Sequence, residues 1–401
     1  MKLRILVLSF YYEPDLSAGS FRTTALVQAL LKKMPDDAQV DVITTMPNRY
    51  SSFITKVPKL ERSDRLTIRR IPLPVHHSGM FDQSKAFLAY AVSALRQVRK
   101  HKYVLIYATS SRLMTAVLGS VVARWKRSPL YLDIRDIFVD TINDVLSKKM
   151  IFVVRPVILW LERFALKRAQ RVNLVSEGFL SYFHHSYPQL SLAFFTNGVD
   201  PEFMNAFEAH RNTAAVSADK PIAVLYAGNM GEGQGLHAII PYLAEKMGGR
   251  VQFRLIGDGG RRPELERAIL ARGVRNVKVM DPVSRSRLVE EYREADVLFL
   301  HLNDYDALKK VLPSKIFEYA ATGKPIWAGV AGFAAQFLKR EVHNAVVFEP
   351  CNVDEAVRAF AILDLVSVSR QDFVRRFSRE AISRDMAGDI LSTLDPTADR
   401  A

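Results

Sequence analysis

Apolar and polar positions alternate in blocks along the first half of the chain. Residues 2–10 form a short apolar run, residues 11–20 form a polar loop, and Leu26, Leu30 and Leu31 give residues 21–33 the spacing of a helix. A strand, a loop and a helix in this order open a βαβ unit. The same pattern predicts strands over residues 39–45, 66–71, 104–107, 130–134 and 171–175, and helices over 87–100, 113–124 and 154–168. This alternation is typical of a parallel, doubly wound α/β sheet.

The alternation stops at residues 206–220, which are polar and without periodicity, and restarts after Pro221. We interpret the interruption as a linker. Beyond it, the pattern predicts strands over 222–227, 251–256, 277–280, 297–300 and 325–328, and helices from 236 and over 264–272, 287–294, 314–321 and 334–338. The sequence therefore predicts two α/β domains, residues 1–205 and 221–371, and a terminal segment, 372–401. A chain of 401 residues has room for two or three domains.

The composition is that of a water-soluble globular protein, with 49% hydrophobic and 24% charged residues. The single cysteine, Cys351, excludes an internal disulfide and a cysteine zinc cluster, so a reducing cytoplasm is expected. No apolar run reaches the roughly 18–20 residues of a membrane span. The apolar run near the N-terminus is too short for the core of a signal peptide. We therefore expect a cytoplasmic protein.

The net positive charge of the chain lies entirely in its first half. Residues 1–200 hold 29 basic and 15 acidic residues, whereas residues 201–401 hold 27 of each, which places the whole net charge of +14 in the first half. Such asymmetry indicates an anionic partner, namely nucleic acid, a diphosphate or an acidic membrane surface, or else a solvated basic face. The basic residues are not interleaved with aromatic residues in a recognisable nucleic-acid module, which argues against nucleic acid.

Three segments carry candidate chemistry. Gly19 lies just before a predicted helix, where exposed backbone N–H groups can bind an anion and Arg22 can add positive charge. Asp133, Arg135 and Asp136 follow a predicted buried strand, at the edge where α/β sheets bind ligands. In the third segment Ser314 is a predicted N-cap, and Lys315 stands in the first helical turn, which the helix dipole disfavours unless an anion shares the site.

No metal site is expected. Asp304 and Asp306 match a D-x-D pattern, but a motif this short occurs by chance, and no paired histidines or further cysteines stand nearby. The turn formed by Gly257, Asp258, Gly259 and Gly260 follows a predicted strand and is a plausible phosphate or nucleotide turn, although it is weak as a dinucleotide fingerprint.

Several segments, taken in order, resemble the retaining glycosyltransferases of family four. They are LSFYYEPDLSAGS at 8–20, DIRD at 133–136, LVSEGF at 174–179, NGVD at 197–200, YAGNMG at 226–231, LIGDG at 255–259 and PSKIFEYAATGKP at 313–325. The resemblance covers about residues 3 to 350 and is closest to the bacterial O-antigen and capsule branch, which includes amino-deoxysugar transferases. It implies a GT-B fold, with two Rossmann-like domains facing a cleft and a last helix that returns to the first domain.

The resemblance also implies roles for individual residues. Gly19 would approach the donor diphosphate, Asp133, Arg135 and Asp136 would line the acceptor side, and Glu318 would bind the ribose hydroxyls. The donor-binding set is Gly19, Gly228, Asn229, Gly257, Arg261, Val283, Ser314, Lys315 and Glu318, and the catalytic set is Asp133, Arg135, Asp136 and Lys315.

The sequence departs from the family pattern in two motifs, at three positions. Lys310 replaces the first glutamate of the E-x7-E motif, and Asn229 and Gln234 replace an arginine and a lysine on the donor loop. Lys315 and Arg261 are the cations that could neutralise the diphosphate instead.

The sequence therefore predicts a metal-independent retaining glycosyltransferase without a cofactor. Its substrates would be a nucleotide-diphosphate sugar, most simply UDP-linked, and a lipid-linked glycan at the inner face of the plasma membrane. The predicted helix over 154–168 sets Val157, Ile158, Leu161 and Phe164 beside basic residues, which suits either a membrane interface or packing in the core. The alternatives are a UDP-sugar 2-epimerase on the same fold and a non-catalytic nucleic-acid-binding protein.

Overall fold

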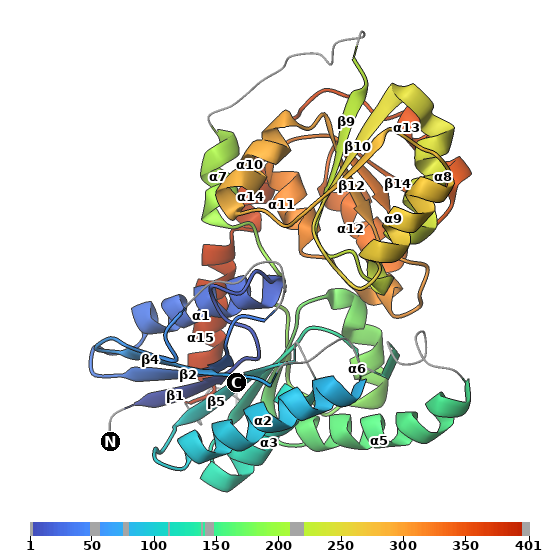
Figure 1. Ribbon diagram of the computed structural model, residues 1–401. Helices are drawn as coiled ribbons and strands as arrows, with labels where there is room; N and C mark the ends of the chain where they lie inside the picture. Colours follow the sequence, from blue (N-terminus) through green and yellow to red (C-terminus); the bar gives the residue numbers. More distant parts are fainter. Residues whose placement is uncertain are drawn as a thin grey trace. The chain divides into compact units, whose positions relative to one another are not determined.

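The computed structural model describes residues 3–48, 57–74, 80–110, 113–137, 139–140, 148–208 and 220–394. The chain forms two α/β units, each built on a parallel sheet (Figure 1). The first unit comprises Met1–Asn197 and Glu380–Ala401, and the second comprises Gly198–Arg379. The division by packing thus falls at residues 197 and 379, whereas the sequence placed the boundaries at 205 and 372.

The first sheet has the strand order β3-β4-β2-β1-β5-β6-β7-β8 among the described residues. All of its neighbouring strands are parallel except β3 and β4, which are antiparallel. Its strands are β1 (Arg4–Leu8), β2 (Gln39–Thr45), β3 (Leu60–Arg62), β4 (Leu66–Ile71), β5 (Leu105–Thr109), β6 (Leu130–Ile134), β7 (Ala169–Leu174) and β8 (Leu192–Ala193).

Helices cover both faces of this sheet, because its strands are apolar on both sides (Figure 1). On one face, Leu26 and Leu30 of α1 (Ala18–Lys33) and Ile390 of α15 (Arg379–Ser392) pack against the core of β1, β2 and β5. The helices α2 (Met80–Val98), α3 (Leu113–Lys126) and α5 (Lys148–Leu166) lie on the other face, and a short helix, α6 (Leu180–Ser186), follows β7.

The second sheet is entirely parallel, with the order β11-β10-β9-β12-β13-β14. Its strands are β9 (Ile222–Ala227), β10 (Val251–Ile256), β11 (Val277–Met280), β12 (Val297–His301), β13 (Ile326–Gly329) and β14 (Ala345–Phe348). Its helices are α7 (Pro201–Glu208), α8 (Leu236–Met247), α9 (Arg262–Ala271), α10 (Arg285–Glu294), α11 (Lys315–Ala321), α12 (Gly332–Glu341), α13 (Val353–Ala361) and α14 (Gln371–Arg376).

Two separate apolar clusters fill the faces of the second sheet. Helices α8, α9 and α13 pack on one face around Phe253, Phe299 and Trp327. Helices α7, α10, α11, α12 and α14 pack on the other, where Tyr292 and Phe317 are fully buried. The second unit is therefore a doubly wound domain in its own right, as the sequence predicts.

The terminal segment differs from its expected form. The sequence suggests one helix over residues 372–394, but the structure has two, α14 and α15, interrupted near Ser378. Here the backbone leaves helical geometry to pair with another segment: Val199 N–H donates to Phe377 O at 2.7 Å, and Arg379 N–H donates to Val199 O at 2.9 Å. The helix ends because its backbone groups form this bridge instead.

The strand orders define where ligands are expected. In each sheet the chain reverses direction of winding beside the first strand, between β1 and β5 in the first unit and between β9 and β12 in the second. Ligands of open α/β sheets bind outside the carboxyl ends of the strands at such a switch point. The loops that follow β1, β6, β9 and β10 carry many of the residues selected from the sequence.

Candidate functional site

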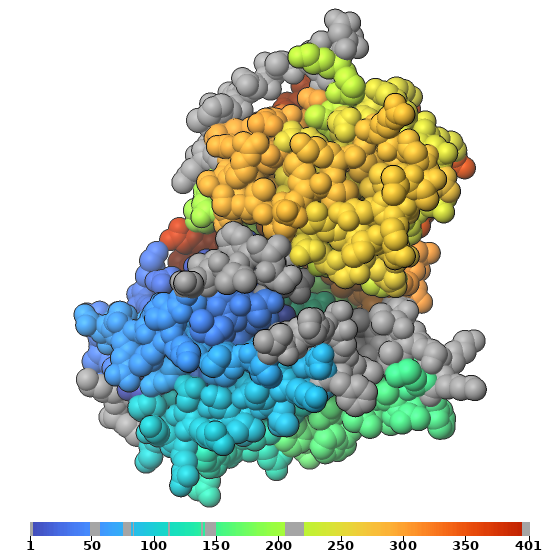
Figure 2. Space-filling view, in the orientation of Figure 1, coloured from blue at the N-terminus to red at the C-terminus, as the bar shows by residue number. Residues whose placement is uncertain are grey.

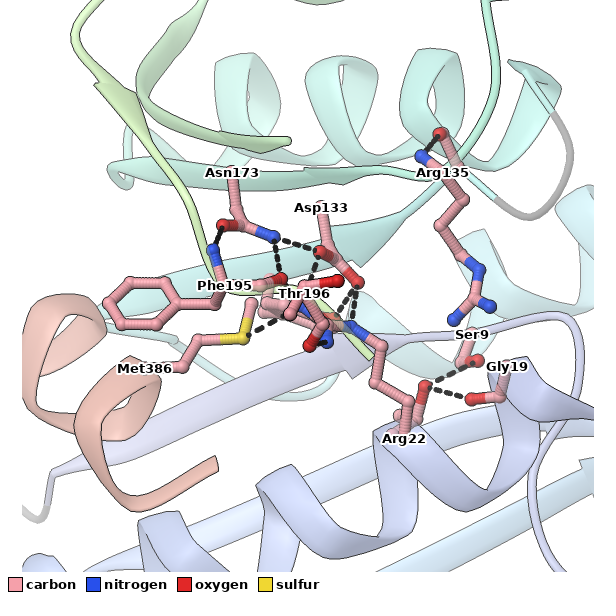
Figure 3. Close-up of polar contacts among 12 residues, drawn as sticks. Ser9, Gly19, Arg22, Asp133, Arg135, Asn173, Phe195, Thr196 and Met386 are labelled. Carbon is pink, nitrogen blue, oxygen red and sulfur yellow. Dashed lines mark hydrogen bonds and ion pairs between the residues drawn. The ribbon is translucent and has the colours of Figure 1, made fainter. Parts of the chain in front are cut away.

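In the first unit, the N-terminus of α1 faces an arginine from the end of β6. The helix begins after Ser17, whose hydroxyl oxygen accepts a 3.1 Å hydrogen bond from Ser20 N–H. A methyl group on Gly19 would lie 3.6 Å from Arg135 Nη1, so the guanidinium sits directly beside the first turn (Figure 3). The structure thus brings together two of the predicted residues, Gly19 and Arg135.

Arg135 Nη1 is buried and has no hydrogen-bond partner among the described residues. The backbone of Arg135 is fixed, since its N–H donates to Ser110 Oγ at 3.0 Å. A buried guanidinium N–H without an acceptor is costly, and a helix N-terminus offers further donors rather than acceptors. The two features together are suited to an anion with several oxygen atoms.

Asp133 has a different environment from the one expected. The sequence places it on the rim of the sheet, but its side chain is completely buried. Its carboxylate accepts four hydrogen bonds: from Arg22 Nε at 2.9 Å and Nη2 at 3.0 Å, from Tyr107 Oη at 2.9 Å and from Asn173 Nδ2 at 2.7 Å (Figure 3). It has no exposed surface with which to contact an acceptor, so we correct its assignment from a catalytic to a structural group.

Arg22 is also committed to this cluster rather than to the anion site. Besides Asp133, its guanidinium donates to the carbonyl oxygens of Thr196 at 2.6 Å and Phe195 at 2.7 Å. Burial alone would raise the pKa of Asp133, but the ion pair with Arg22 and the hydrogen bonds lower it below its ordinary value. The cluster therefore ties α1, β6 and the segment before residue 197 together around a charged pair.

Asp136 lies two residues beyond the end of β6 and, unlike Asp133, is exposed. It borders a small cavity that is also lined by Glu162 of α5. Of the three predicted charged residues in this segment, Arg135 and Asp136 thus remain available to a ligand, and Asp133 does not.

In the second unit, two loops at the carboxyl ends of β9 and β10 touch through their backbones. A Cβ atom on Gly257 would lie 1.8 Å from Gly228 O, and Gly257 has a φ of 147°, so only glycine fits. Gly228 N–H in turn donates to Ile256 O at 2.9 Å. This close approach requires glycine at position 257 and holds the loop after β9 against the loop after β10.

Lys315 and Glu318 of α11 lie beside that loop. Lys315 Cε is 3.6 Å from the Cβ position of Gly228, and Lys315 Nζ donates to Glu318 Oε2 at 2.8 Å. The same carboxylate oxygen accepts a 3.1 Å hydrogen bond from Tyr292 Oη, a buried group of α10. Sequence analysis missed Tyr292, because an aromatic residue on a buried helix face carries no signal that separates it from ordinary core.

The two departures on the donor loop form a pair. Asn229 Nδ2 donates to Gln234 Oε1 at 2.6 Å, so two amides hold each other where the family has two cations. Arg261 forms ion pairs with Glu232 and Glu264 and Lys315 forms one with Glu318, so both candidate cations are paired, and they differ in that Lys315 Cε lies 3.6 Å from the Cβ position of Gly228. Lys315 is therefore the predicted cation that adjoins Gly228.

The remaining predicted residues occupy the same edge of the second sheet. Val283 lies in the loop after β11 and packs on the apolar cluster around α11. Ser314 stands at the N-cap position of α11, but its side chain makes no capping hydrogen bond, because its backbone is already helical, with φ −58° and ψ −26°. Lys310 lies in a short 3-10 helix, Leu308–Lys310, and is partly exposed.

A lysine side chain lies against both carboxylates of the D-x-D motif. Lys309 Nζ lies 3.5 Å from Asp304 and 2.8 Å from Asp306. Among the described residues, no group of three or more histidine, cysteine or acidic side chains is placed to hold a metal ion. In the same part of the chain, no helix combines the length and apolarity needed to cross a membrane.

Comparison with known proteins gives two family matches. Residues 209–379 match the model described as Glycosyl transferases group 1, and residues 22–194 match the Glycosyl transferase 4-like domain. The chain is 25% identical over 420 residues to an Escherichia coli (strain K12) protein named "Putative colanic acid biosynthesis glycosyl transferase WcaI", an alignment that covers 97% of this chain and 100% of that protein.

Solved structures share the fold at low identity. Sucrose-phosphate synthase from Thermosynechococcus elongatus superposes with a TM-score of 0.74 at 16% identity, over 98% of this chain and 99% of the other. HepE from Anabaena, solved in complex with UDP, gives a TM-score of 0.53 at 16% identity, over 98% and 97% of the two chains. The two family matches span most of the chain and coincide with two Rossmann-like units, and on this evidence the protein is a GT-B glycosyltransferase of the family-four type.

Proposed function

We propose that this protein transfers a sugar, with retention of anomeric configuration and without a metal ion, from a nucleotide-diphosphate sugar to a lipid-linked glycan of a surface polysaccharide. The observation that carries the proposal is the arrangement in the second unit, where Gly228, Lys315 and Glu318 meet at the carboxyl edge of the sheet. A glycine backbone, an ammonium group and a carboxylate in contact are suited to a phosphate and a sugar hydroxyl.

The chemistry requires a departing diphosphate to be stabilised as the glycosidic bond breaks. Lys315 supplies positive charge beside the donor loop, and exposed backbone N–H groups of glycine loops supply dipoles at fixed positions. In the first unit, Arg135 and the N-terminus of α1 form a second anion site, whose ligand we propose to be a phosphate group of the donor, as the family resemblance implies. These groups need no cation to neutralise the leaving group.

For the nucleotide we propose UDP, and for the ribose we propose Glu318. The UDP complex of HepE, which shares the fold, supports the first proposal, and the position of Glu318 in the PSKIFEY segment supports the second. Its carboxylate is held by Lys315 and Tyr292, so its orientation is fixed before a nucleotide binds.

The acceptor and location are proposed from relatives and from charge. A relative named for colanic acid biosynthesis aligns along nearly the whole chain, and the whole net positive charge lies within the first 200 positions. A lipid-linked glycan at the inner, anionic face of the plasma membrane fits both observations, and it places the enzyme as a peripheral protein there. An N-acetyl-deoxysugar donor, as used in the branch that the sequence resembles, is the first candidate to test.

A panel of nucleotides and nucleotide sugars tests the proposal through thermal stabilisation. A ligand at about 100 times its dissociation constant adds about 2.7 kcal/mol to the free energy of unfolding, so UDP-linked members should raise the melting temperature of the second unit. Glu318→Gln should weaken that binding about 10- to 150-fold, because a hydrogen bond to a charged group contributes about 1.5–3 kcal/mol. The matched control is Glu290→Gln, which alters an exposed ion pair with Arg287.

Three results would contradict the proposal. Glu318→Gln with unchanged UDP affinity would remove its role at the ribose. Loss of turnover in EDTA with recovery in manganese would show that Asp304 and Asp306, or other carboxylates, hold a metal. Conversion of a UDP-sugar without any acceptor would favour an epimerase over a transferase.

A further inference from the structure

Helix α5 exposes an apolar stripe along its outer face. Phe152 is 85% exposed, Val153 is 68% exposed, Val157 is 54% exposed and Trp160 is 63% exposed. The sequence predicted a face made of Val157, Ile158, Leu161 and Phe164, but Ile158 and Leu161 turn inward and are half-buried. Large apolar side chains exposed side by side on one helix are unusual for a surface that meets only water.

A basic depression lies at the end of this helix, at the amino ends of β5, β6 and β7. It has a volume of about 1040 Å³, and its lining includes Lys102, Lys126, Arg127 and Arg168. None of its described lining residues is acidic, and none of these four cations pairs with a described carboxylate. The depression is thus a concave surface with four positive charges and no internal counter-charge.

Aromatic and cationic side chains connect the stripe to the depression. Trp160 stacks on Phe164, with ring centroids 5.9 Å apart, and the guanidinium of Arg124 lies 5.9 Å from the centroid of the Phe164 ring. The next residue, Trp125, is 49% exposed and lines the depression, where Lys126 Nζ lies 4.8 Å from its ring centroid. The residues involved belong to α3 and α5. The segments coloured cyan to green, which include these helices, form the lower part of the first unit in Figure 2.

We propose that this surface is a docking site for an anionic lipid bilayer, in which the α5 stripe enters the interfacial layer and the basic depression binds a phosphate headgroup. The proposal rests on the proposed function, since it names the surface by which a peripheral enzyme would reach a lipid-linked acceptor. Apolar groups bordered by unpaired cations match the acyl boundary and the phosphates of such a membrane. Binding of a free phosphate would not account for the exposed apolar side chains of α5.

The depression is distinct from the anion site at Gly19 and Arg135. That site follows the carboxyl ends of β1 and β6, whereas the depression lies at the amino ends of β5, β6 and β7, on the opposite edge of the same sheet. The basic cluster at residues 62–70 is less available for docking. Arg70 is buried and pairs with Glu61, and Arg65 donates to the carbonyl oxygens of Met34 and Pro35.

Co-sedimentation of the full chain with vesicles tests the proposal. Phosphatidylcholine vesicles are prepared with and without phosphatidylglycerol as about one third of the lipid, and comparing them separates the electrostatic contribution to binding from apolar insertion. The wild type should bind only the anionic vesicles, and less tightly as salt rises. A triple variant, Lys102→Gln, Arg127→Gln and Arg168→Gln, should bind about 100-fold more weakly, because each basic side chain near an anionic leaflet contributes about fivefold.

The matched control removes three exposed charges elsewhere in the first unit, through Lys33→Gln, Lys59→Gln and Arg62→Gln. Lys59 and Arg62 lie at β3, the edge of the sheet far from β7, so this variant should keep most of the affinity. Insertion has its own readout in a Trp125→Phe background, which removes the other exposed tryptophan of this surface. Brominated lipid should then quench Trp160, and Trp160→Phe should remove that quenching, while Trp327 is fully buried and contributes none.

Several results would overturn the proposal. The first is an equal loss of vesicle affinity in the triple variant and its control, and the second is equal binding of the wild type to neutral and anionic vesicles. The third is that brominated lipid does not quench tryptophan fluorescence, and the fourth is that millimolar glycerol phosphate alone displaces the protein from vesicles. The fifth is tighter binding to RNA than to vesicles with the same dependence on the three residues. Thermal stabilisation of the triple variant by UDP distinguishes a failure of the docking surface from a failure of the proposed transferase function. If that stabilisation is retained while vesicle binding fails, only the docking surface is wrong. If the wild type gains none, the proposed function is wrong and the vesicle result stands by itself.

Discussion

At position 19, replacing the side-chain hydrogen of glycine by a methyl group should affect ligand binding without affecting folding. A methyl group there would meet Arg135 Nη1 and Ser17 Oγ at 3.6 and 3.8 Å, which are ordinary contact distances, and position 19 has no unusual backbone angle. Alanine also favours a helix by about 1 kcal/mol over glycine. The methyl group would nevertheless stand between the first turn of α1 and the guanidinium, where we place an anion.

We therefore predict that Gly19→Ala keeps or slightly raises the melting temperature while it weakens donor binding at least tenfold. The physical reason is that the methyl group excludes a phosphate oxygen from the N–H groups without disturbing the protein itself. Calorimetric titration with a UDP-sugar, alongside a thermal melt, measures both effects. Unchanged affinity in a stably folded Gly19→Ala protein would remove the anion site at α1 from the account.

The loops of the second unit show how strictly an element can constrain its glycines. Gly257 is wedged against the backbone of the donor loop, with a φ of 147°, whereas Gly260, three residues on, has nothing within 4 Å of its Cβ position. Gly257→Ala should therefore lower the free energy of unfolding by several kcal/mol or displace the donor loop, since the clash is with backbone. Gly260→Ala should change it by less than about 0.5 kcal/mol.

Urea unfolding measures the comparison when both variants also carry Trp125→Phe and Trp160→Phe. Fluorescence then reports Trp327, which is fully buried in the second unit. If Gly257→Ala and Gly260→Ala were equally stable and bound UDP equally, the close approach of the two loops would not exist in solution. The pair is a fair comparison, since both substitutions add the same methyl group to the same loop.

Strands were easier to predict than the ends of helices. The apolar runs predicted β2, β4, β6, β9, β10 and β11 with the bounds that the structure shows. The runs were decisive because parallel strands buried on both faces are continuously apolar. The start of α5 at Lys148 was missed because Pro156, a residue type usually found in the first turn of a helix, lies inside this one. The break between α14 and α15 was missed because it is set by pairing with Val199, far away in sequence.

At the scale of the whole molecule, what the sequence could not predict is long-range pairing. The motifs selected Asp133, yet the residue that neutralises it, Arg22, lies 111 positions away, and Tyr107 and Asn173 complete the cluster. Likewise the Asn229–Gln234 pair and the contact of Lys315 with Gly228 follow from folding. Residue type and spacing identified segments with chemistry, but only packing decides which charges are already satisfied and which remain for a ligand.

Buried titratable groups make the stability of the second unit depend on pH, and His301 is the clearest case. It is fully buried at the end of β12, where Cys351 N–H donates to its Nε2 at 3.0 Å, so its Nδ1–H donates to Gln234 O at 2.7 Å. This arrangement holds the neutral ring, and burial lowers the pKa of His301 from 6.5 to about 4. Protonation therefore costs more in the folded protein than in the unfolded chain.

A group whose folded pKa is depressed contributes stability above its unfolded pKa, and this contribution is lost as pH falls toward the folded pKa. His301 should thus stabilise the second unit fully above about pH 6.5 and lose about 3 kcal/mol by pH 4, at about 1.4 kcal/mol per unit of pKa shift. Urea unfolding with and without His301→Gln, in the same Trp125→Phe and Trp160→Phe background and monitored through Trp327 at pH 7.5, 5.5 and 4.5, isolates this effect from the carboxylates, which titrate in both proteins. The advantage of the wild type over His301→Gln should shrink steadily over that range, and an advantage that stays constant with pH would show that His301 keeps an ordinary pKa in the folded protein.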